Sequence, residues 1–310
     1  MRLLKTRKLM RKFVRLARFV HGYVVFYLFY HGWGSYVSVN NGKPRRVGRL
    51  TFCADPFLLE YGGASWLFYE SIDKCGKGFI GCFKFDNGRW CDIGSVLAEP
   101  WHLSYPQVFV ENGKVYMIPE SCDFGKGDVC LYEATDFPRG WKKVAKLIDR
   151  PFADSTVLKH DGHWYMACYT IPPNESAELW HAPLLIGPWS RHPMWDKINQ
   201  SNRLRRCGGS FIVEDGKLYR IAQDCNGMYG KRLFKVEVCE LSPSAYKEGE
   251  AIVLLDRTSA PQGYKHTYNR MTLGKDVWHV VDVHEDFLEK PQVVFMNIAK
   301  ALRKKFLRHG

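Results

Sequence analysis

The chain has 310 residues, 15% of them aromatic, and a formal net charge of +13. A chain of this length forms one large domain or two ordinary ones, and the aromatic content suits both β-sheet packing and sugar stacking. The positive charge is not accompanied by an RNA-module signature or by zinc-finger spacing, so we expect no nucleic-acid partner.

The positive charge is concentrated at the two ends of the chain. Residues 1–54 contain twelve Lys and Arg residues and no acidic residue, and residues 300–310 contain five more basic residues. Residues 3–20 place apolar side chains at helical spacing between basic ones, which predicts an amphipathic helix. Because basic amphipathic helices bind anionic membranes, we expect residues 1–20 to contact such a surface. The alternatives are a solvated basic arm and a nucleic-acid patch.

The aromatic run at residues 23–30 is too short to span a bilayer, which needs about 20 apolar residues. It either enters the membrane interface or supplies a strand. No small-residue cleavage site follows it, so we expect no cleaved signal peptide. The ten cysteines form no C-x-x-C pair, and we interpret them as buried apolar residues in a reducing compartment. We therefore expect a cytoplasmic protein, peripheral at the inner face of the membrane.

A hairpin motif recurs five times along the chain. Its first copy, residues 54–71, consists of two strand-like runs joined by a glycine turn, with Asp55 starting the first run and Glu70 ending the second. Further strand-like runs follow each copy, which gives about four strands per repeat. A period of roughly 40–50 residues with several short strands is typical of a β-propeller. The five turn glycines are Gly63, Gly113, Gly162, Gly216 and Gly274.

We therefore predict an all-β fold, a five-bladed β-propeller preceded by a basic amphipathic helix. The expected domains are a membrane-surface segment of residues 1–34, the propeller of residues 35–292 and a basic tail of residues 293–310. A β-sandwich with coincidental hairpins is the alternative, but unrelated hairpins would not keep so regular a register.

The register of the repeat predicts two rings of residues at one end of the propeller axis. The two ends of an antiparallel hairpin meet at the same edge, so residues that start the first strand and residues that end the second face a common channel. The first ring is Asp55, Tyr105, Asp154, Gly208 and His266 or Thr267. The second ring is Glu70, Glu120, Tyr169, Gln223 and Asp282.

The carboxylates in these rings favour carbohydrate chemistry. One carboxylate can act as base or nucleophile, and another, whose pKa is raised by crowding, can act as acid. The candidate catalytic residues are Asp55, Asp154, Glu70 and Glu120. The alternatives are a strand cap for Asp55 and rim salt bridges for the two glutamates. The sequence predicts no definite cofactor, although carboxylates and His266 would suit a divalent cation at the axis.

Polar residues in the fourth and fifth repeats are candidate substrate-binding residues. They are Arg206, Arg220, Gln223, Asp224, His266, Tyr268 and Asn269. The two arginines suit bidentate binding of phosphate or carboxylate, and the Gln-Asp pair suits sugar hydroxyls. The alternative is a salt-bridged blade interior.

Several motifs, in order along the chain, resemble those of a known family. They include Ala-Asp-Pro-Phe from Ala54, Ile-Pro-Glu-Ser from Ile118, Gly-Gly-Ser-Phe from Gly208 and Gln-Asp-Cys from Gln223. Over roughly residues 50–285, the chain resembles the N-terminal domain of plant glucosamine inositolphosphorylceramide transferases and its stand-alone bacterial relatives. That domain in turn resembles the five-bladed propellers of the arabinanase, xylosidase and invertase group.

The resemblance to furanosidase propellers implies roles for two aspartates. A first-blade Asp that acts as base or nucleophile corresponds to Asp55, and a third-blade Asp that orients or tunes corresponds to Asp154. Those hydrolases usually take their acid Glu from the fourth blade, where this chain has Gly208, Gln223 and Asp224. In the plant proteins the recognised glycosyltransferase domain lies outside the region that is matched here.

From the residues and the resemblance together, we expect a carbohydrate-active protein of glycan or glycolipid biosynthesis at the inner membrane face. Its expected reaction is glycosyl transfer in the acidic axial site, with a sugar or glycolipid as substrate. Two alternatives stay open. One is a glycoside hydrolase of the furanosidase type, and the other is a non-catalytic glycan- or headgroup-binding module that partners a separate glycosyltransferase.

Overall fold

The computed structural model describes residues 32–285 except 51, 74–75, 122–126, 171–174, 200–202 and 227–228. The chain divides into two compact units, one formed by Gly34–Val283 and the other by Met1–Trp33 with His284–Gly310. The helix expected at residues 3–20 and the basic tail from residue 293 lie outside the described residues. Within the described ranges, no helix is long and apolar enough to cross a membrane.

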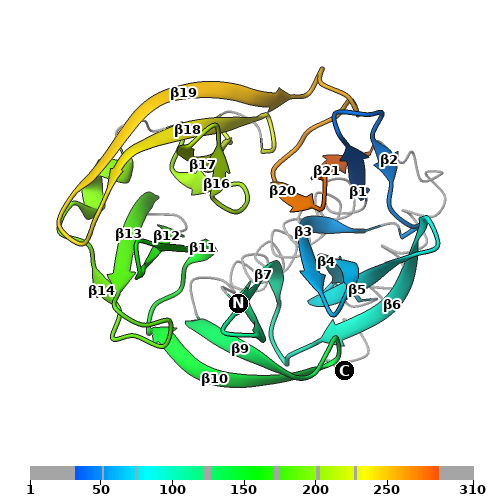
Figure 1. The fold of residues 1–310 in the computed structure, drawn as a ribbon, viewed down its shortest axis with the longest axis horizontal. Coiled ribbons are helices and arrows are strands. Elements are labelled where there is room, and N and C mark those ends of the chain that lie inside the picture. The colour runs from blue at the N-terminus through cyan, green and yellow to red at the C-terminus, as the bar shows by residue number, and fades with distance from the viewer. Residues whose placement is uncertain are drawn as a thin grey trace, which may run out of the picture. The chain divides into compact units, whose positions relative to one another are not determined.

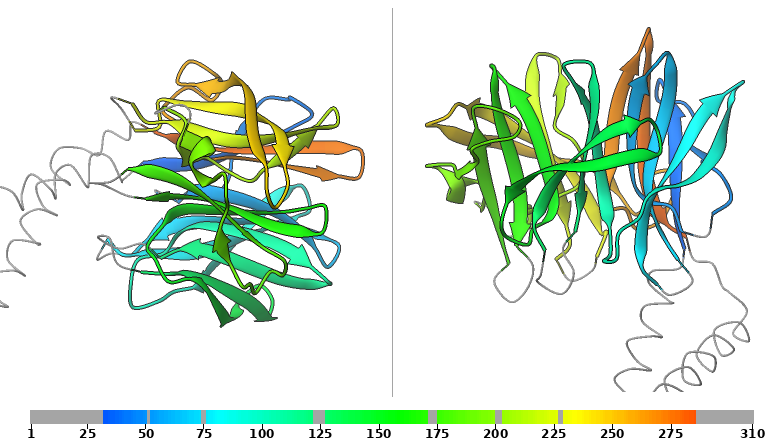
Figure 2. Two further views of the ribbon diagram at one scale, coloured as in Figure 1. Left: turned by 90° about the vertical axis from the view of Figure 1, so that its left-hand side faces the viewer. Right: turned by 90° about the horizontal axis from the view of Figure 1, so that it is seen from below.

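The unit Gly34–Val283 is a five-bladed β-propeller, as the repeat predicts. Five antiparallel sheets surround a common axis, and they follow one another in chain order (Figure 1). We number them blades 1 to 5. In each blade the strand order runs from the axis outward, so that the hairpin of the repeat lies innermost (Figures 1 and 2).

The first three blades have four strands each. Blade 1 contains β3 (Ala54–Tyr61), β4 (Ala64–Ile72), β5 (Gly78–Asp86) and β6 (Arg89–Leu97). Blade 2 contains β7 (Ser104–Glu111), β8 (Lys114–Glu120), β9 (Val129–Asp136) and β10 (Gly140–Ile148). Blade 3 contains β11 (Ala153–His160), β12 (His163–Thr170), β13 (Ser176–Ala182) and β14 (Ser190–Arg191).

The last two blades depart from this plan. Blade 4 follows the 3₁₀-helix η1 (Trp195–Asn199), and its inner strand is split in two. It contains β15 (Arg206–Cys207), β16 (Ile212–Glu214), β17 (Lys217–Asp224), β18 (Arg232–Leu241) and β19 (Tyr246–Asp256). Blade 5 contains β20 (Tyr268–Leu273), β21 (Asp276–His284), β1 (Trp33–Val39) and β2 (Arg45–Arg46).

Blade 5 closes the ring by joining the two ends of the propeller sequence. Its strand order is β2-β1-β21-β20, so the inner strands come late in the chain and the outer strands come before blade 1. The N–H of Asn40 donates to the Val277 carbonyl at 2.8 Å, and the Asn40 side chain contacts Asp276. The ring therefore closes through hydrogen bonds between its first and last strands.

The inner hairpins turn at the glycines that the repeat identifies. Asn112-Gly113, Asp161-Gly162 and Asp215-Gly216 all have positive φ, with 51° and 77° in the first pair. Two successive residues with positive φ form the tight turn that matches the twist of a hairpin. Asn, Asp and Gly adopt this conformation most readily, which explains their recurrence at these positions.

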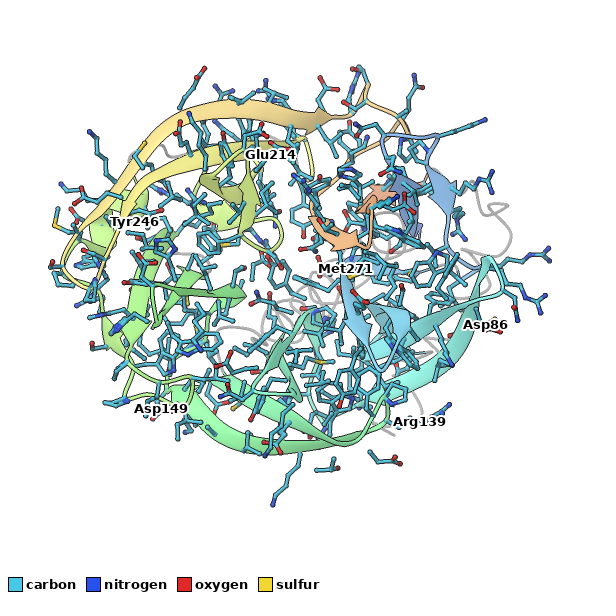
Figure 3. The ribbon with its side chains drawn as sticks, viewed as in Figure 1. Asp86, Arg139, Asp149, Glu214, Tyr246 and Met271 are labelled. Carbon is cyan, nitrogen blue, oxygen red and sulfur yellow. The ribbon has the colours of Figure 1, made fainter. Side chains whose placement is uncertain are left out.

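The blades pack face to face through large apolar side chains. Phe57 in blade 1 packs edge-on against Tyr105 in blade 2, with ring centroids 4.9 Å apart. Phe137, from the β9–β10 turn, lies 4.9 Å from the ring of Trp66 in blade 1. Burial of a side chain of this kind stabilises the fold by about 1.5–3 kcal/mol. Figure 3 shows such side chains filling the space between neighbouring sheets.

Candidate active site

Three inner strands begin with the same strained backbone. The second residues of β3, β7 and β11 are Asp55, Tyr105 and Asp154, and their φ angles are 47°, 44° and 47°. In each strand the pairing register shifts at this point. A positive φ costs a non-glycine residue about 1–2 kcal/mol, and such strain often accompanies functional sites. Because of this backbone conformation, the three side chains do not follow the usual alternation of side chains between the two faces of a strand.

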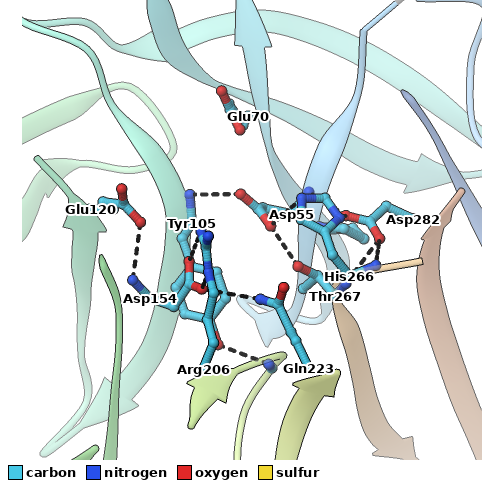
Figure 4. A network of polar contacts seen from close by, with 12 residues as sticks. Asp55, Glu70, Tyr105, Glu120, Asp154, Arg206, Gln223, His266, Thr267 and Asp282 are labelled. Atoms are coloured by element: carbon cyan, nitrogen blue, oxygen red, sulfur yellow. Dashed lines mark hydrogen bonds and ion pairs between the residues drawn. The ribbon is translucent and has the colours of Figure 1, made fainter. Parts of the chain in front are cut away.

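Each of these strained residues is held by a carboxylate. The N–H of Asp55 donates to Asp282 Oδ2 at 3.0 Å, and the N–H of Tyr105 donates to Asp55 Oδ2 at 3.2 Å. The N–H of Asp154 donates to Glu120 Oε2 at 3.0 Å. The carboxylates therefore connect blade 5 to blade 1, blade 1 to blade 2, and blade 2 to blade 3 around the axis (Figure 4).

Asp55 lies at the centre of this network and is 5% exposed. Its Oδ1 atom accepts a 2.5 Å hydrogen bond from the Thr267 hydroxyl and lies 3.4 Å from His266 Nε2. Burial raises the pKa of the Asp55 carboxyl to about 8, although the His266 charge acts in the opposite direction. Near neutral pH, Asp55 can therefore both give and accept a proton.

His266 is fixed by Asp282, which is fully buried. Nδ1 of His266 lies 2.6 Å from Asp282 Oδ2, and Asp282 Oδ1 accepts the N–H groups of His266 and Thr267 at 3.0 and 2.9 Å. Burial alone would lower the pKa of His266, but the Asp282 and Asp55 carboxylates outweigh it and raise that pKa to about 9. His266 is therefore a cation at neutral pH and faces Asp55.

Asp154 is paired with an arginine, whereas Asp55 faces a histidine. Arg206 donates to it through Nε and NH2, and Gln223 Nε2 donates to Asp154 Oδ2 at 3.0 Å. The guanidinium carbon of Arg206 lies 5.7 Å from the ring centroid of Tyr169 and 5.3 Å from that of Tyr229. Tyr229 is 43% exposed, so an aromatic face reaches solvent beside the carboxylates.

The two glutamates of the second ring have different surroundings. Burial and the Asp154 carboxylate raise the pKa of Glu120 well above its usual range. Glu70 Oε1 lies 3.1 Å from His102 Nε2, and His102 Nδ1 accepts the N–H of Gly78 at 3.0 Å. Because Nδ1 acts as the acceptor, the ring proton sits on Nε2 and His102 donates to Glu70. His102 has no equivalent in the repeat, so sequence reasoning missed it.

Residues 43–282 match the model of the family described as glucosamine inositolphosphorylceramide transferase 1, N-terminal. The chain belongs to this family. The curated glucosamine inositolphosphorylceramide transferase 1 of Arabidopsis thaliana is 34% identical over 254 residues, which cover 79% of this chain and 31% of the relative. The Oryza sativa subsp. japonica protein of the same name is 37% identical over 207 residues, covering 64% of this chain and 27% of the relative.

This member of the family thus spans about a third of the length of its curated relatives. Among solved structures, its fold is similar to a thermostable family-43 glycoside hydrolase, with a TM-score of 0.53, 15% identity, and coverage of 72% of this chain and 86% of the hydrolase. It is also similar to an α-L-arabinofuranosidase from Lactobacillus brevis, with a TM-score of 0.54, 16% identity and coverage of 68% and 83%. At these identities the likeness concerns the fold.

The residues of the second ring lie at structurally equivalent positions in the blades of this family member. The ring residues of the first four blades each pair with a residue near the start of the inner strand, and the Asp282 N–H donates to the Thr267 carbonyl. The first ring differs from the prediction in blade 4. There Arg206 pairs with the ring residue Gln223, so Cys207 holds the expected ring position and Gly208 comes one residue later. The reason is that the inner strand of blade 4 is split into β15 and β16, which both pair with β17.

Two of the expected substrate-binding residues lie inside blade 4. Arg220 is 1% exposed, pairs with Glu248 at 2.7 Å and donates to the Leu204 carbonyl. Asp224 is fully buried and accepts a 3.0 Å hydrogen bond from Arg232. These contacts correspond to the salt-bridged blade interior that the sequence left open as the alternative.

Two further expected residues, Asn269 and Tyr268, make buried contacts from β20, and those of Asn269 reach neighbouring blades. Asn269 donates to the Pro56 carbonyl and accepts the Ser210 N–H, both at 2.7 Å. It thereby links blade 5 to blades 1 and 4. The Tyr268 hydroxyl lies 2.7 Å from His279 Nδ1. Both side chains are buried, so they support the site from behind.

Asp55, His266 and Asp282 form the metal-binding candidate of the described residues. One ligand atom from each lies within 4.8 Å of the others. Two carboxylates and an imidazole suit a divalent cation in chemical type. A cation there would replace the proton that His266 shares with Asp282, because the two atoms are already only 2.6 Å apart.

Proposed function

We propose that the axial carboxylate cluster binds a sugar and catalyses glycosyl transfer in glycan or glycolipid assembly. The observation that carries the proposal is the state of Asp55, a buried carboxyl whose pKa is raised to about 8 beside a cationic His266. Membership of the transferase-named family and the glycoside-hydrolase fold support it. For this chain, which covers only part of the length of its curated relatives, transferase activity is itself part of the proposal.

Asp55 is proposed as the proton-transfer group. Glycosyl transfer to a hydroxyl requires removal of the acceptor proton and neutralisation of the departing oxygen, and a group with a pKa near the working pH does either efficiently. The Thr267 hydroxyl and Tyr105 N–H fix both carboxyl oxygens of Asp55. His266, held by Asp282, stabilises the ionised form when Asp55 has given up its proton.

Glu120 and Tyr229 are proposed to orient the sugar. Glu120, whose pKa burial and the Asp154 carboxylate raise well above its usual range, can form a hydrogen bond with a sugar hydroxyl. The exposed ring of Tyr229 offers a stacking face, since aromatic faces bind the apolar face of a sugar. Arg206 donates to Asp154 and thereby fixes the position of that carboxylate.

Hydrolysis of the furanosidase type is less well supported. The fourth-blade position of the second ring is Gln223, whose amide donates to Asp154 and to the Cys207 carbonyl. An amide has no ionisable proton to give to a leaving oxygen. The Asp55 and Glu120 carboxyls belong to blades 1 and 2, so a different arrangement of acid and base is proposed.

A non-catalytic binding module is the second candidate. The observation that favours it is the Arg206–Asp154 pair, in which one of the axial carboxylates is engaged by a guanidinium that lies near the rings of Tyr169 and Tyr229. Such a site would recognise a sugar through hydroxyl contacts and stacking. Turnover by the purified chain distinguishes this candidate from catalysis.

The test uses the full chain with lipid extract as acceptor and a panel of activated sugar donors that includes a glucosamine donor. Mass spectrometry follows the appearance of glycosylated lipid. The proposal expects product with wild type and at least about a hundredfold less with Asp55→Asn. Sugar binding by calorimetry without product from any donor would support the binding module instead.

We also propose that the protein is cytoplasmic and peripheral at the inner membrane face, bound through residues 1–20. Eight basic residues and no acidic one occur in that segment. Of the eight described cysteines, five are buried, which suits thiols that pack as small apolar side chains. Deletion of residues 1–20 should release the protein from anionic vesicles in a sedimentation assay. Unchanged sedimentation of the deleted form would rule the proposal out.

A further inference from the structure

Blade 3 carries a group of histidines at the end that lies away from the axial carboxylates. His163 is the first residue of β12, whereas the ring residue Tyr169 lies near the end of that strand. His181 lies on β13, and His192 follows β14. The proposed function uses none of these three histidines, so they form a separate feature of the fold.

His163 and His181 lie on the same face of the sheet and contact each other. Tyr165 pairs with His181 in the register of β12 and β13, and His163, two positions before Tyr165, points to the same face. Nε2 of His163 lies 3.2 Å from Nδ1 of His181. The ring centroids are 5.4 Å apart, and the ring planes differ by 33°. Two imidazole nitrogens from adjacent strands therefore meet at one point.

The separation of these two nitrogens fits a metal ion that is bound by both. A Zn–N bond is about 2.0–2.1 Å long, so two nitrogens on one tetrahedral zinc ion lie about 3.3–3.4 Å apart. The hydrogen bond between the two rings requires that one nitrogen donates and the other is an unprotonated acceptor. If the donating ring carries its proton on its other nitrogen instead, both nitrogens offer lone pairs to an ion.

His160 supplies a third imidazole on this face. It is the last residue of β11 and lies opposite His163 in the register of β11 and β12. Residues opposite each other in an antiparallel pair have side chains on the same face, with Cβ atoms about 4.5–5.5 Å apart. The His160 side chain is 35% exposed, and its Nε2 lies 3.5 Å from Oδ2 of the exposed Asp161. Three neighbouring strands thus each contribute one imidazole.

His192 closes the inner side of the group and is not itself a candidate ligand. Its Nε2 lies 2.7 Å from the Ser242 carbonyl oxygen, and its Nδ1 accepts the N–H of Met194 at 3.0 Å. Both of its ring nitrogens are therefore used, Nε2 as the donor. The buried ring of His192 lies edge-on to that of His181, with centroids 5.1 Å apart. Because Ser242 belongs to the β18–β19 turn of blade 4, the inner wall of the group is held by the neighbouring blade.

We propose that His160, His163 and His181 bind a divalent transition-metal ion, with water as the remaining ligand. We call these three residues the histidine site. Imidazole suits zinc, copper and nickel ions, and three histidines with one water are an established set of zinc ligands. A bound ion links β11, β12 and β13 and thereby stabilises blade 3. The histidine site is independent of the proposed glycosyl transfer.

The test is zinc binding to the full chain without a histidine tag, measured by isothermal titration calorimetry and by thermal unfolding. Wild type is expected to bind zinc at the histidine site and to unfold at a higher temperature when zinc is present. His160→Gln, His163→Gln and His181→Gln should each weaken this binding by about tenfold or more. Even the loss of an outer partner of a metal ligand costs about 10–100-fold in affinity.

Two further variants separate the histidine site from other groups that bind zinc. Asp55→Asn removes one ligand of the axial group and should leave binding at the histidine site unchanged. His279→Gln, on β21 of blade 5, is the matched control and should also leave it unchanged. Circular dichroism of each variant confirms that the blades are intact.

Several results would overturn the proposal. Zinc binding that keeps its wild-type affinity in both His163→Gln and His181→Gln would do so, as would binding that Asp55→Asn alone abolishes. An equal loss in His279→Gln would show that the binding is not specific to blade 3. Full affinity in His160→Gln would contradict the three-histidine ligand set.

Discussion

The backbone N–H of Asp55 donates a 3.0 Å hydrogen bond to Oδ2 of Asp282, 227 positions away in sequence. This contact joins the first blade to the last strand of the propeller. The same Asp282 side chain holds His266 at Nδ1 and accepts two further N–H groups. One buried carboxylate therefore closes the ring and positions the groups that surround Asp55.

Replacing Asp282 should destabilise the fold strongly. Asp282→Asn removes the negative charge that His266 faces and one of the acceptor oxygens, and loss of one partner from a buried ion pair costs about 3–5 kcal/mol. We expect a fall of about 3 kcal/mol in the free energy of unfolding, measured with guanidinium chloride. Asp276→Asn, at an exposed position that contacts Asn40, is the control and should stay within about 0.5 kcal/mol of wild type. Equal effects of the two variants would contradict this role.

The raised pKa of Asp55 gives a pH dependence of known sign. The folded pKa is about 8 against 3.8 for the free group, so the native state holds a proton that the unfolded state releases between these values. Stability therefore falls as pH rises through this window. Asp55→Asn has no such proton, and Asn tolerates a positive φ. Its free energy of unfolding, relative to wild type, should improve from about pH 5 to about pH 9. Parallel curves for the two proteins would show that the pKa of Asp55 is not raised.

His181 in blade 3 should make the stability of the fold depend on pH in the acid range. Burial and the neighbouring His192 and His163 lower the pKa of His181 from 6.5. The stability that neutral His181 contributes is present above pH 6.5, the pKa of the free group, and is lost as pH falls through the lower pKa of the folded state. His181→Gln should therefore gain on wild type by a few tenths of a kcal/mol between about pH 7.5 and about pH 5.5, a small effect because the ring is partly exposed. His160→Gln, at the end of β11 in the same blade, is the control, and an equal gain there would contradict the assignment.

Gly209 should not tolerate a side chain. Its N–H donates to the Tyr105 hydroxyl at 2.8 Å, and a Cβ atom there would lie 1.8 Å from the Tyr268 carbonyl oxygen, with φ at 140°. We expect Gly209→Ala to destabilise by about 3 kcal/mol or more, through both strain and displacement of blade 5. Gly216→Ala is the matched control, because nothing lies within 4 Å of its Cβ position. It should cost only about 1 kcal/mol, and thermal unfolding compares the two.

The sequence was sufficient to predict the number of blades and the ring positions of the first three blades. Asn/Asp-Gly turns and a constant distance from strand start to strand end carry that information, and they place Asp55 and Asp154 at the starts of inner strands. Contacts between repeats do not follow from a repeat. The Arg206–Asp154 pair and the support of Glu70 by His102 depend on side chains that have no counterpart in other blades.

Burial in blade 4 was also beyond the sequence pattern. Arg220 and Asp224 lie on the face of β17 opposite to that of the ring residue Gln223. Their partners come from the outer strands of the same sheet and the preceding loop. The repeat does not predict the closure of blade 5 by β1 and β2 either. The five hairpins supply only the inner strands of that blade, and its outer strands come from before the first repeat.

The most direct test of the account is the turnover number of Asp55→Asn compared with that of wild type, under saturating donor and lipid acceptor. Loss of a proton-transfer group reduces the rate by about 10²–10⁴-fold. We predict a reduction in this range, with sugar binding and far-UV circular dichroism unchanged. Turnover by the folded variant at the wild-type rate would contradict the proposal that Asp55 moves the proton in this site.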